Sequence, residues 1–463
     1  MKKAWLREYE LMCGAKPKIL KEEEQGWLFS QKVEEMDDIM LKSKWTSNVP
    51  GSGAPERVIV GAIADYGNMG YDVSQAEELI DEGFAYLEKN DMANLNRVTW
   101  RIWHILNNAP KIKDHPYFKY ETYDSLEKIL SSIDCQRTYT PVDKEGKHFF
   151  AQTYYGWLAQ IVGGALGTAI EGYTTENIRE TFGEIHGYVR EPNTYNDDIT
   201  YEVAFLRALE EKGKNLTSAD IAEMWTALIT FGWSAEEWAL RNIKNGIYPP
   251  RSGYENNPYR EWIGAQMRGA VCGQVAPANP LLALKLAYAD GVVSHHNNGV
   301  LGEIFNAVLV SLSYVTADVK QLLKETISYI PPKSEYFSVV EFAYKTCERC
   351  KDWESAWQIL REKYKIYNWI HAYPNAAAEV AALYYGGGDF DKTMHIISMI
   401  GFDADCNAAQ IATCLGIIHT DKTLKEKWTA PIGDTLKTYI RNHKTMSIRQ
   451  LAADTVKAAK LLD

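Results

Sequence analysis

The stretch Ala376–Tyr385 reads AAAEVAALYY, and the stretch Asn407–Ile418 reads NAAQIATCLGII. Both are rich in Ala, and both are apolar around most of the circumference that they would have as helices, which is typical of buried helices. Similar segments recur along the chain: Leu79–Leu87, Val98–Leu106, Ile221–Phe231, Leu281–Tyr288 and Ile304–Tyr314. The plausible strands are short, such as Val58–Val60. We therefore predict an all-α fold, a compact globule of many packed helices.

The first 150 residues differ in composition from the rest of the chain and are richer in charged residues. They contain charge runs such as Lys21–Glu24 and Glu34–Asp38, which we interpret as the solvent-facing sides of helices. A stretch rich in Gly, Pro and Ser, Asn48–Pro55, resembles a linker. We predict a mostly helical N-terminal extension of unknown role over residues 1–150, followed by a domain over residues 151–463 that carries the motifs described below.

The bulk composition excludes several classes of protein. A net charge of −11 argues against binding to nucleic acid or to an anionic membrane surface. We find no signal peptide and no run of about 20 apolar residues. The seven cysteines are an odd number, and Cys347 and Cys350 lack a second pair that would complete a zinc site. We interpret these two as ordinary thiols, one facing the core, and expect a cytoplasmic protein.

Two acidic clusters precede helical segments. Asn196-Asp197-Asp198 lies before the segment that continues through Val203–Leu206, and Asp403-Ala404-Asp405-Cys406 lies before the Ala-rich stretch that starts at Asn407. Taken singly, each cluster is explained by capping and by the preference of acidic side chains for helix N-termini. Together they place four carboxylates in one fold, and such a group repels itself unless cations are bound. An oxygen donor set without a nearby His favours Mg²⁺ or Mn²⁺.

A third element lies upstream of both clusters. Gly163 and Gly167, with other small residues nearby, allow close packing of a helix that ends near Glu171 and Gly172. An acid at a helix C-terminus is opposed by the helix dipole, so Glu171 is poorly placed unless a metal or substrate compensates. The alternative is an exposed Glu in a turn.

These three elements, in this order, resemble the motifs of the ADP-ribosylglycohydrolase family over about residues 151–430. The family has a Gly-rich helix ending in Glu, resembled by Gly163–Glu171, and a Thr-Asp-Asp-Thr motif, resembled by Asn196–Thr200. It also has a Gly-x-Asp-x-Asp-[Ser/Thr]-Asn motif, resembled by Gly401–Asn407. Further matches are Met267-Arg268, Ser294-His295 and Gly387–Phe390. The sequence departs from the family at Gly164, Asn196, Ile199 and Cys406, and a thiol is a poorer ligand than a hydroxyl for a hard cation.

The resemblance implies a binuclear site for two Mg²⁺ (or Mn²⁺) and a glycosylase that cleaves a ribosyl N- or O-glycosidic bond. The implied substrate is an ADP-ribosylated protein or an ADP-ribose-like small molecule. The implied metal ligands are Asn196, Asp197, Asp198, Asp403, Asp405 and Cys406. The implied catalytic residues are Glu171, Asp198 and Asp405, and the substrate-binding residues are Gly264, Met267, Arg268 and His295. For Arg268, a bidentate contact to a diphosphate is expected, and a surface position on a helix is the alternative.

Two other functions fit parts of this pattern. A catalytically silent family member that binds a ligand or has a structural role would explain the departures at Ile199 and Cys406. A Mg²⁺-dependent prenyl-diphosphate enzyme is also all-α with Asp-rich motifs, but its acids stand mid-helix and four residues apart. The oligomeric state has no signature in the sequence.

Overall fold

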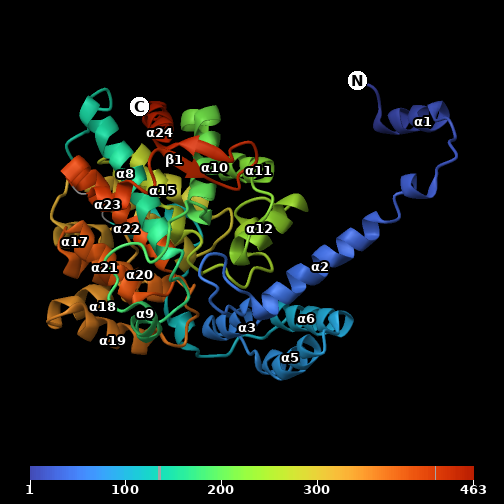
Figure 1. The fold of residues 1–463 in the computed structure, drawn as a ribbon, viewed down its shortest axis with the longest axis horizontal. Coiled ribbons are helices and arrows are strands. Elements are labelled where there is room, and N and C mark those ends of the chain that lie inside the picture. Colours follow the sequence, from blue (N-terminus) through green and yellow to red (C-terminus); the bar gives the residue numbers. More distant parts are fainter. Residues whose placement is uncertain (134–136, 423) are drawn as a thin grey trace.

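The computed structural model describes residues 1–133, 137–422 and 424–463. It is predominantly helical, which confirms the predicted all-α fold (Figure 1). Within those ranges the only strands are β1 (Thr435–Lys437) and β2 (Thr445–Ser447), an antiparallel pair with Leu436 opposite Met446. The predicted strand Val58–Val60 is wrong, because these residues form the first turn of a helix.

The N-terminal region contains α1 (Ala4–Gly14), η1 (Glu22–Glu24), α2 (Phe29–Thr46), α3 (Val58–Asn68), α4 (Ser74–Glu77), α5 (Ile80–Glu88), α6 (Met92–Asn107), η2 (Pro116–Lys119) and α7 (Leu126–Ser132). The middle of the chain contains α8 (Lys147–Gly167), α9 (Thr175–Phe182), α10 (Asp197–Lys212), η3 (Gly213–Asn215), α11 (Ser218–Leu228), α12 (Ser234–Lys244), α13 (Arg251–Tyr254), η4 (Gln266–Arg268), α14 (Ala270–Val275), α15 (Pro280–Gly291) and α16 (Asn298–Ser313). The last part contains α17 (Val319–Ile327), α18 (Glu335–Arg349), α19 (Trp353–Tyr364), α20 (Ala372–Gly386), α21 (Phe390–Ile400), α22 (Ala404–His419), η5 (Thr420–Lys422), α23 (Glu426–Thr429) and α24 (Ile448–Lys460). The predicted helical segments all overlap these helices. Leu79 lies one residue before α5, Tyr314 lies one residue after α16, and α11 ends three residues before Phe231.

Helices α8 and α22 pack side by side and antiparallel at the centre of the globule (Figure 1). Their backbones approach closely because α8 carries glycine where it faces the first half of α22. A Cβ added at Gly163 would lie 2.5 Å from the carbonyl oxygen of Ala408, and one added at Gly167 would lie 2.2 Å from the Cα of Asp405. Helix α8 therefore fixes the position of the first turn of α22, which carries Asp405.

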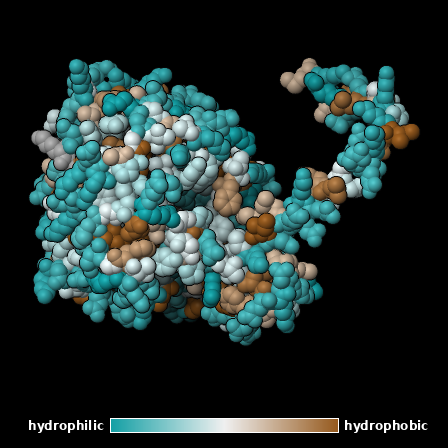
Figure 2. Space-filling view, in the orientation of Figure 1, coloured by the Kyte–Doolittle hydropathy of each residue, from teal (hydrophilic) through white to brown (hydrophobic). Residues whose placement is uncertain are grey.

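The N-terminal region joins the same hydrophobic core as the rest of the chain. Trp45, near the end of α2, is fully buried, its Nε1 donates a hydrogen bond to Thr99 Oγ1 at 2.9 Å, and its ring packs edge-on against Phe84. The stretch Asn48–Pro55, predicted to be linker-like, is instead a packed loop closed by a β-bridge between Asn48 and Pro55. In contrast, α1 and the first part of α2 form an arm that projects from the globule, with apolar side chains exposed along it (Figures 1 and 2).

Deleting residues 1–28 is expected to leave the thermal midpoint of unfolding unchanged, because none of these residues is buried. The contrasting variant Trp45→Ala removes a fully buried indole from the same region and is expected to lower the free energy of unfolding by about 3–5 kcal/mol. Differential scanning calorimetry compares the two. A truncation as damaging as the Trp45 variant would contradict this division of the N-terminal region.

The described cysteines are all free thiols, with Cys347 buried and Cys350 half-buried, as predicted for this pair. Cys135 lies outside the described residues. No helix in the described ranges has the length and apolar character needed to cross a membrane.

Candidate metal centre

The loop before α22 fixes Asp403 and Asp405. Gly401 and Phe402 both have left-handed φ angles, +73° and +58°, and a Cβ at Gly401 would lie 2.2 Å from the carbonyl oxygen of Tyr173, so glycine is required there. Asn375 Oδ1 then accepts hydrogen bonds from the Asp403 amide at 3.3 Å and from Asn407 Nδ2 at 2.8 Å. These contacts hold the Asp403–Asp405 segment against α20, so both carboxylates stand on rigid backbone.

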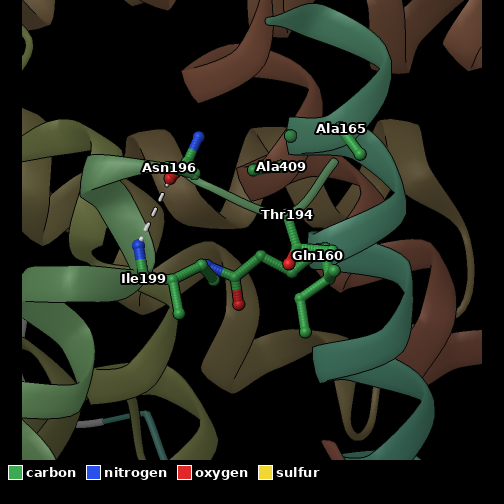
Figure 3. Close-up of a pocket in the computed structure, with 8 residues that line it drawn as sticks. Gln160, Ala165, Thr194, Asn196, Ile199 and Ala409 are labelled. Carbon is green, nitrogen blue, oxygen red and sulfur yellow. Dashed lines mark hydrogen bonds between the residues drawn. The ribbon is translucent and has the colours of Figure 1, made fainter. Parts of the chain in front are cut away.

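The first acidic cluster meets the second through Asn196. Asn196 is the N-cap of α10, and its Oδ1 accepts a hydrogen bond from the Ile199 amide at 3.3 Å (Figure 3). Its Nδ2 donates to Asp405 Oδ2 at 3.2 Å. A small pocket beside Asn196 is lined by residues of α8, α10, α22 and the loop before α10, among them Gln160, Thr194 and Ala409 (Figure 3). Asn196 thus caps α10 as predicted, and its side-chain carbonyl oxygen already accepts the hydrogen bond from the Ile199 amide.

Asp198 and Cys406 form the second link between the clusters. The Cys406 thiol donates to Asp198 Oδ1 at 3.2 Å, and burial, followed by repulsion from Asp198, raises the pKa of the thiol well above its ordinary value. Both the hydrogen bond and the raised pKa favour the protonated thiol in the absence of a metal ion. Oxygen or sulfur atoms of Asp403, Asp405 and Cys406 lie within 4.8 Å of one another, a spacing that a metal ion can bridge.

Glu171 approaches the centre from the turn after α8. The helix ends at Gly167, four residues earlier than the sequence suggested, and the Glu171 amide continues the turn by donating to Gly167 O at 3.0 Å. Gly172 has φ +80°, and its amide donates to the carbonyl oxygen of Phe402 at 2.7 Å. Glu171 is buried rather than exposed in a turn, and its carboxyl interacts most strongly with that of Asp405.

The carboxyl groups of the centre are buried close to one another, and this raises the pKa values of several of them. Burial, followed by repulsion from Asp405, raises the pKa of Asp197 to about 6. Burial and neighbouring carboxylates raise the pKa values of Glu171, Asp198 and Asp403 well above their ordinary range. Within the described residues, Asp198 Oδ2 and Asp405 Oδ1 are buried without a hydrogen-bond partner. Orphaned carboxylate oxygens of this kind fit bound divalent cations, which supply the missing partners and remove the repulsion.

Of the predicted substrate-binding residues, Met267 contacts the centre through Cys406, and Arg268 is buried rather than on the surface. All five of its N–H donors are engaged: Nε by Asp290, Nη1 by Glu236 Oε1 and Gly264 O, and Nη2 by Asp290 O and Ser294 Oγ. Its side chain is 1% exposed. The alternative of a surface position is wrong, and the expected contact to a diphosphate stays a prediction, since every donor of Arg268 binds a protein acceptor in this structure.

The other three residues of that group pack around Arg268. A Cβ at Gly264 would lie 2.0 Å from Glu236 Oε1, so glycine makes room for the Glu236–Arg268 ion pair. Met267 is buried with its sulfur 3.8 Å from Cys406 Sγ. His295 is fully buried, its Nδ1 lies 2.7 Å from Ser294 Oγ, and burial lowers its pKa well below the ordinary value. Their contact with a substrate stays a prediction.

Sequence reasoning missed several residues that shape the centre. Asn375 positions the Asp403 loop, and Gln410 of α22 accepts a hydrogen bond from the Ala270 amide at 3.0 Å and so links η4 and α14 to α22. Glu56 and Glu236 are buried acids whose carboxyls are both repelled by Asp197. None belongs to a motif, although the position of Asn375 just before the Ala-rich stretch could have drawn attention to it.

The model of the ADP-ribosylglycohydrolase family matches residues 149–461. The chain belongs to this family. An ADP-ribosylglycohydrolase domain therefore spans about two thirds of the chain, and residues 1–148 lie outside the match. The family is a hydrolase family and is generally metal-dependent, in agreement with the acidic cluster found here.

Two further comparisons show what else this chain is similar to. An uncharacterized protein of Archaeoglobus fulgidus is 24% identical over 294 residues, which cover 60% of this chain and 90% of that protein. A solved structure, described as an ADP-ribosylglycohydrolase-related protein complex, aligns with a TM-score of 0.50 at 18% identity over 68% of this chain and 99% of that chain. The second match shows a shared fold.

Proposed function

We propose that this chain is a divalent-metal-dependent glycosylase that hydrolyses a ribosyl N- or O-glycosidic bond. The substrate that we propose is ADP-ribose attached to a modified protein or to a small molecule. The observation that carries the proposal is the meeting of two acidic clusters, joined by the Asn196 Nδ2 to Asp405 Oδ2 hydrogen bond of 3.2 Å. In addition, Asp198 Oδ2 and Asp405 Oδ1, one from each cluster, are buried without a hydrogen-bond partner in the described residues.

The proposed metal ligands are the carboxylates of Asp197, Asp198, Asp403 and Asp405, with two Mg²⁺ or Mn²⁺ as the ions. Oxygen donors favour these hard cations. Bound cations would lower the pKa of a nearby water and stabilise negative charge on substrate oxygens. The Cys406 thiol donates to Asp198 and can orient that carboxylate, and a thiol is a poorer ligand than a carboxylate for a hard cation.

In the proposed reaction Glu171 is the acid and Asp198 is the base. Glu171 is not a proposed ligand, and its raised pKa favours a proton on its carboxyl, which can be donated to the atom that leaves the anomeric carbon. The pKa of Asp198 is also raised in the metal-free protein, but bound cations would compete with that proton and keep Asp198 ionised. Asp198 Oδ2 accepts a proton from water as the water oxygen bonds to that carbon and the glycosidic bond breaks. Asp403 and Asp405 would serve as metal ligands during this step, on a segment that Asn375 holds in place.

The two other functions considered from the sequence fare differently. Membership in the ADP-ribosylglycohydrolase family argues against a prenyl-diphosphate enzyme, as does the position of Asp197 and Asp198 in the first turn of α10 rather than in mid-helix. A silent family member is the outcome that activity measurements must exclude.

The proposal is tested by a screen with Mg²⁺ or Mn²⁺ for release of ADP-ribose or ribose. The substrates are an ADP-ribosylated protein, ADP-ribosylarginine, O-acetyl-ADP-ribose and nucleosides. We expect metal-dependent turnover of at least one ADP-ribosyl substrate and its loss with a chelator. A folded protein that turns over none of these substrates with either metal would refute the proposal.

Stabilisation by Mn²⁺ is expected to increase with pH. In the metal-free protein the raised pKa values of Asp197, Asp198 and Asp403 mean that the folded state binds more protons than the unfolded state, so stability falls as pH rises above about 4. For Asp197 this loss is centred between its ordinary pKa and about 6. Because Mn²⁺ competes with these protons, its effect on the melting temperature should be larger at pH 8 than at pH 5.5. A thermal shift that is equal at both pH values would contradict this expectation.

A further inference from the structure

The loop between α2 and α3, residues 47–57, packs against the turn that carries Glu171, although it lies outside the family match. The carbonyl oxygen of Gly51 accepts a hydrogen bond from Arg190, and Tyr173 Oη donates to the carbonyl oxygen of Ser52 at 3.2 Å. A Cβ at Gly172 would lie 2.4 Å from the Cβ of Ala54. The loop therefore forms a wall next to the proposed acid.

This wall carries one buried carboxyl, Glu56, which is 4% exposed. Its Oε2 accepts hydrogen bonds from Trp233 Nε1 at 2.8 Å and from Ser47 Oγ at 3.4 Å. Its Oε1 is buried and has no hydrogen-bond partner in the described ranges. A buried carboxylate oxygen without a partner is costly, so its presence calls for a partner that is not part of the chain.

The Glu56 carboxyl is close enough to Asp197 for the two charges to interact. Burial raises the pKa of Glu56 to about 7, the hydrogen bonds from Trp233 and Ser47 oppose this rise, and repulsion from Asp197 adds a smaller increase. Trp233 is the N-cap of α12, and the first turn of that helix carries Glu236, which Asp197 also repels. Trp233 thus holds one oxygen of Glu56 and leaves the other without a partner in the described ranges.

We infer that Glu56 is a specificity-determining residue, whose free Oε1 accepts a hydrogen bond from a donor group of the substrate. The donor is either a ribose hydroxyl or an N–H or O–H of the leaving group. This inference rests on the proposed function and adds to it a contact from a segment outside the family match. Because the contact comes from the loop 47–57, we expect this substrate selectivity only in proteins that contain this loop.

The variant Glu56→Gln tests the contact with little change of shape. Its amide oxygen can keep the Trp233 hydrogen bond, which places an NH₂ donor where the free acceptor was. In steady-state kinetics with Mn²⁺, we expect a rise in KM of about ten- to hundred-fold with kcat changed by less than about threefold. Binding of Mn²⁺ alone should be unchanged. The matched control Glu88→Gln alters an exposed acid of the same region and should leave KM unchanged.

Two substrates and the product locate the donor. If the donor belongs to ADP-ribose, the variant raises KM for both O-acetyl-ADP-ribose and ADP-ribosylarginine and weakens binding of ADP-ribose. If the donor belongs to the leaving group, only one of the two KM values rises and ADP-ribose binds as before. An active enzyme whose Glu56 variant has wild-type KM for both substrates overturns the inference alone. A wild-type protein that turns over neither substrate, nor any other in the screen, overturns the proposed function and this inference with it.

Discussion

Replacing Asp405 with Asn is expected to lower kcat/KM by at least about a hundred-fold and to remove the stabilisation by Mn²⁺. Losing an outer partner of a metal ligand already costs about 10–100-fold in activity or affinity, and Asp405 is proposed as a ligand itself. Its Oδ1 is buried and unpartnered within the described residues, while Oδ2 accepts from Asn196. The variant keeps an oxygen for Asn196 and removes the charge.

The metal-free variant should be no less stable than the metal-free wild type, because one carboxylate is removed from a buried group whose members repel one another. Wild-type protein at a Mn²⁺ concentration of 100 Kd gains about 2.7 kcal/mol, and the Asp405→Asn variant should gain almost none. Thermal melts with and without Mn²⁺ measure both quantities. Wild-type activity in the variant would remove Asp405 from the site.

Gly167→Ala is expected to destabilise the protein by about 3 kcal/mol and to weaken Mn²⁺ binding at the same time. The new Cβ would lie 2.2 Å from the Cα and from the N of Asp405 and 2.4 Å from the carbonyl carbon of Ala404. These are backbone atoms in the first turn of α22, so the helices must move apart. The movement displaces Asp405, which couples a packing defect to the metal centre.

The control for this variant is Gly67→Ala in α3, where the nearest atom to a new Cβ is a Val73 methyl at 3.4 Å. Replacing a helical Gly by Ala without a clash is neutral or stabilises by up to about 1 kcal/mol. Urea denaturation gives both free energies of unfolding. If Gly167→Ala unfolds with the same midpoint as the wild type, α8 does not set the position of α22.

The helical fold could be predicted because the local sequence of the central helices already has a helical, apolar pattern. Ala376–Tyr385 and Asn407–Ile418 are apolar on nearly all sides, and both are buried, as parts of α20 and α22. Val58–Val60 failed for the opposite reason: three β-branched residues suggest a strand, but Val58, Ile59, Ala62 and Ile63 follow a helical spacing and are buried together in α3. Burial of these four side chains on one face of a helix outweighed the preference of the three β-branched residues for a strand.

The carboxylates of the site could be predicted because each stands in a short motif before a helix. The residues that arrange them could not, since they come from distant elements and their roles depend on the folded contacts. Glu56 lies 141 positions before Asp197 in the sequence. The two charges interact in the folded protein, where Glu56 is part of the packed loop 47–57. Arg268 lies within a family motif, but its burial in a cage of acids depends on Asp290, Glu236 and Glu303.

The most direct test of the central claim is calorimetric titration of Mn²⁺ into the metal-free full-length chain at pH 7.5. If the clusters before α10 and α22 form one binuclear centre, the titration shows saturable binding of two ions per chain with release of protons. The Asp405→Asn variant loses at least one of these ions. No saturable uptake by folded wild-type protein, or uptake that the Asp405 variant retains in full, would contradict a metal centre at this position.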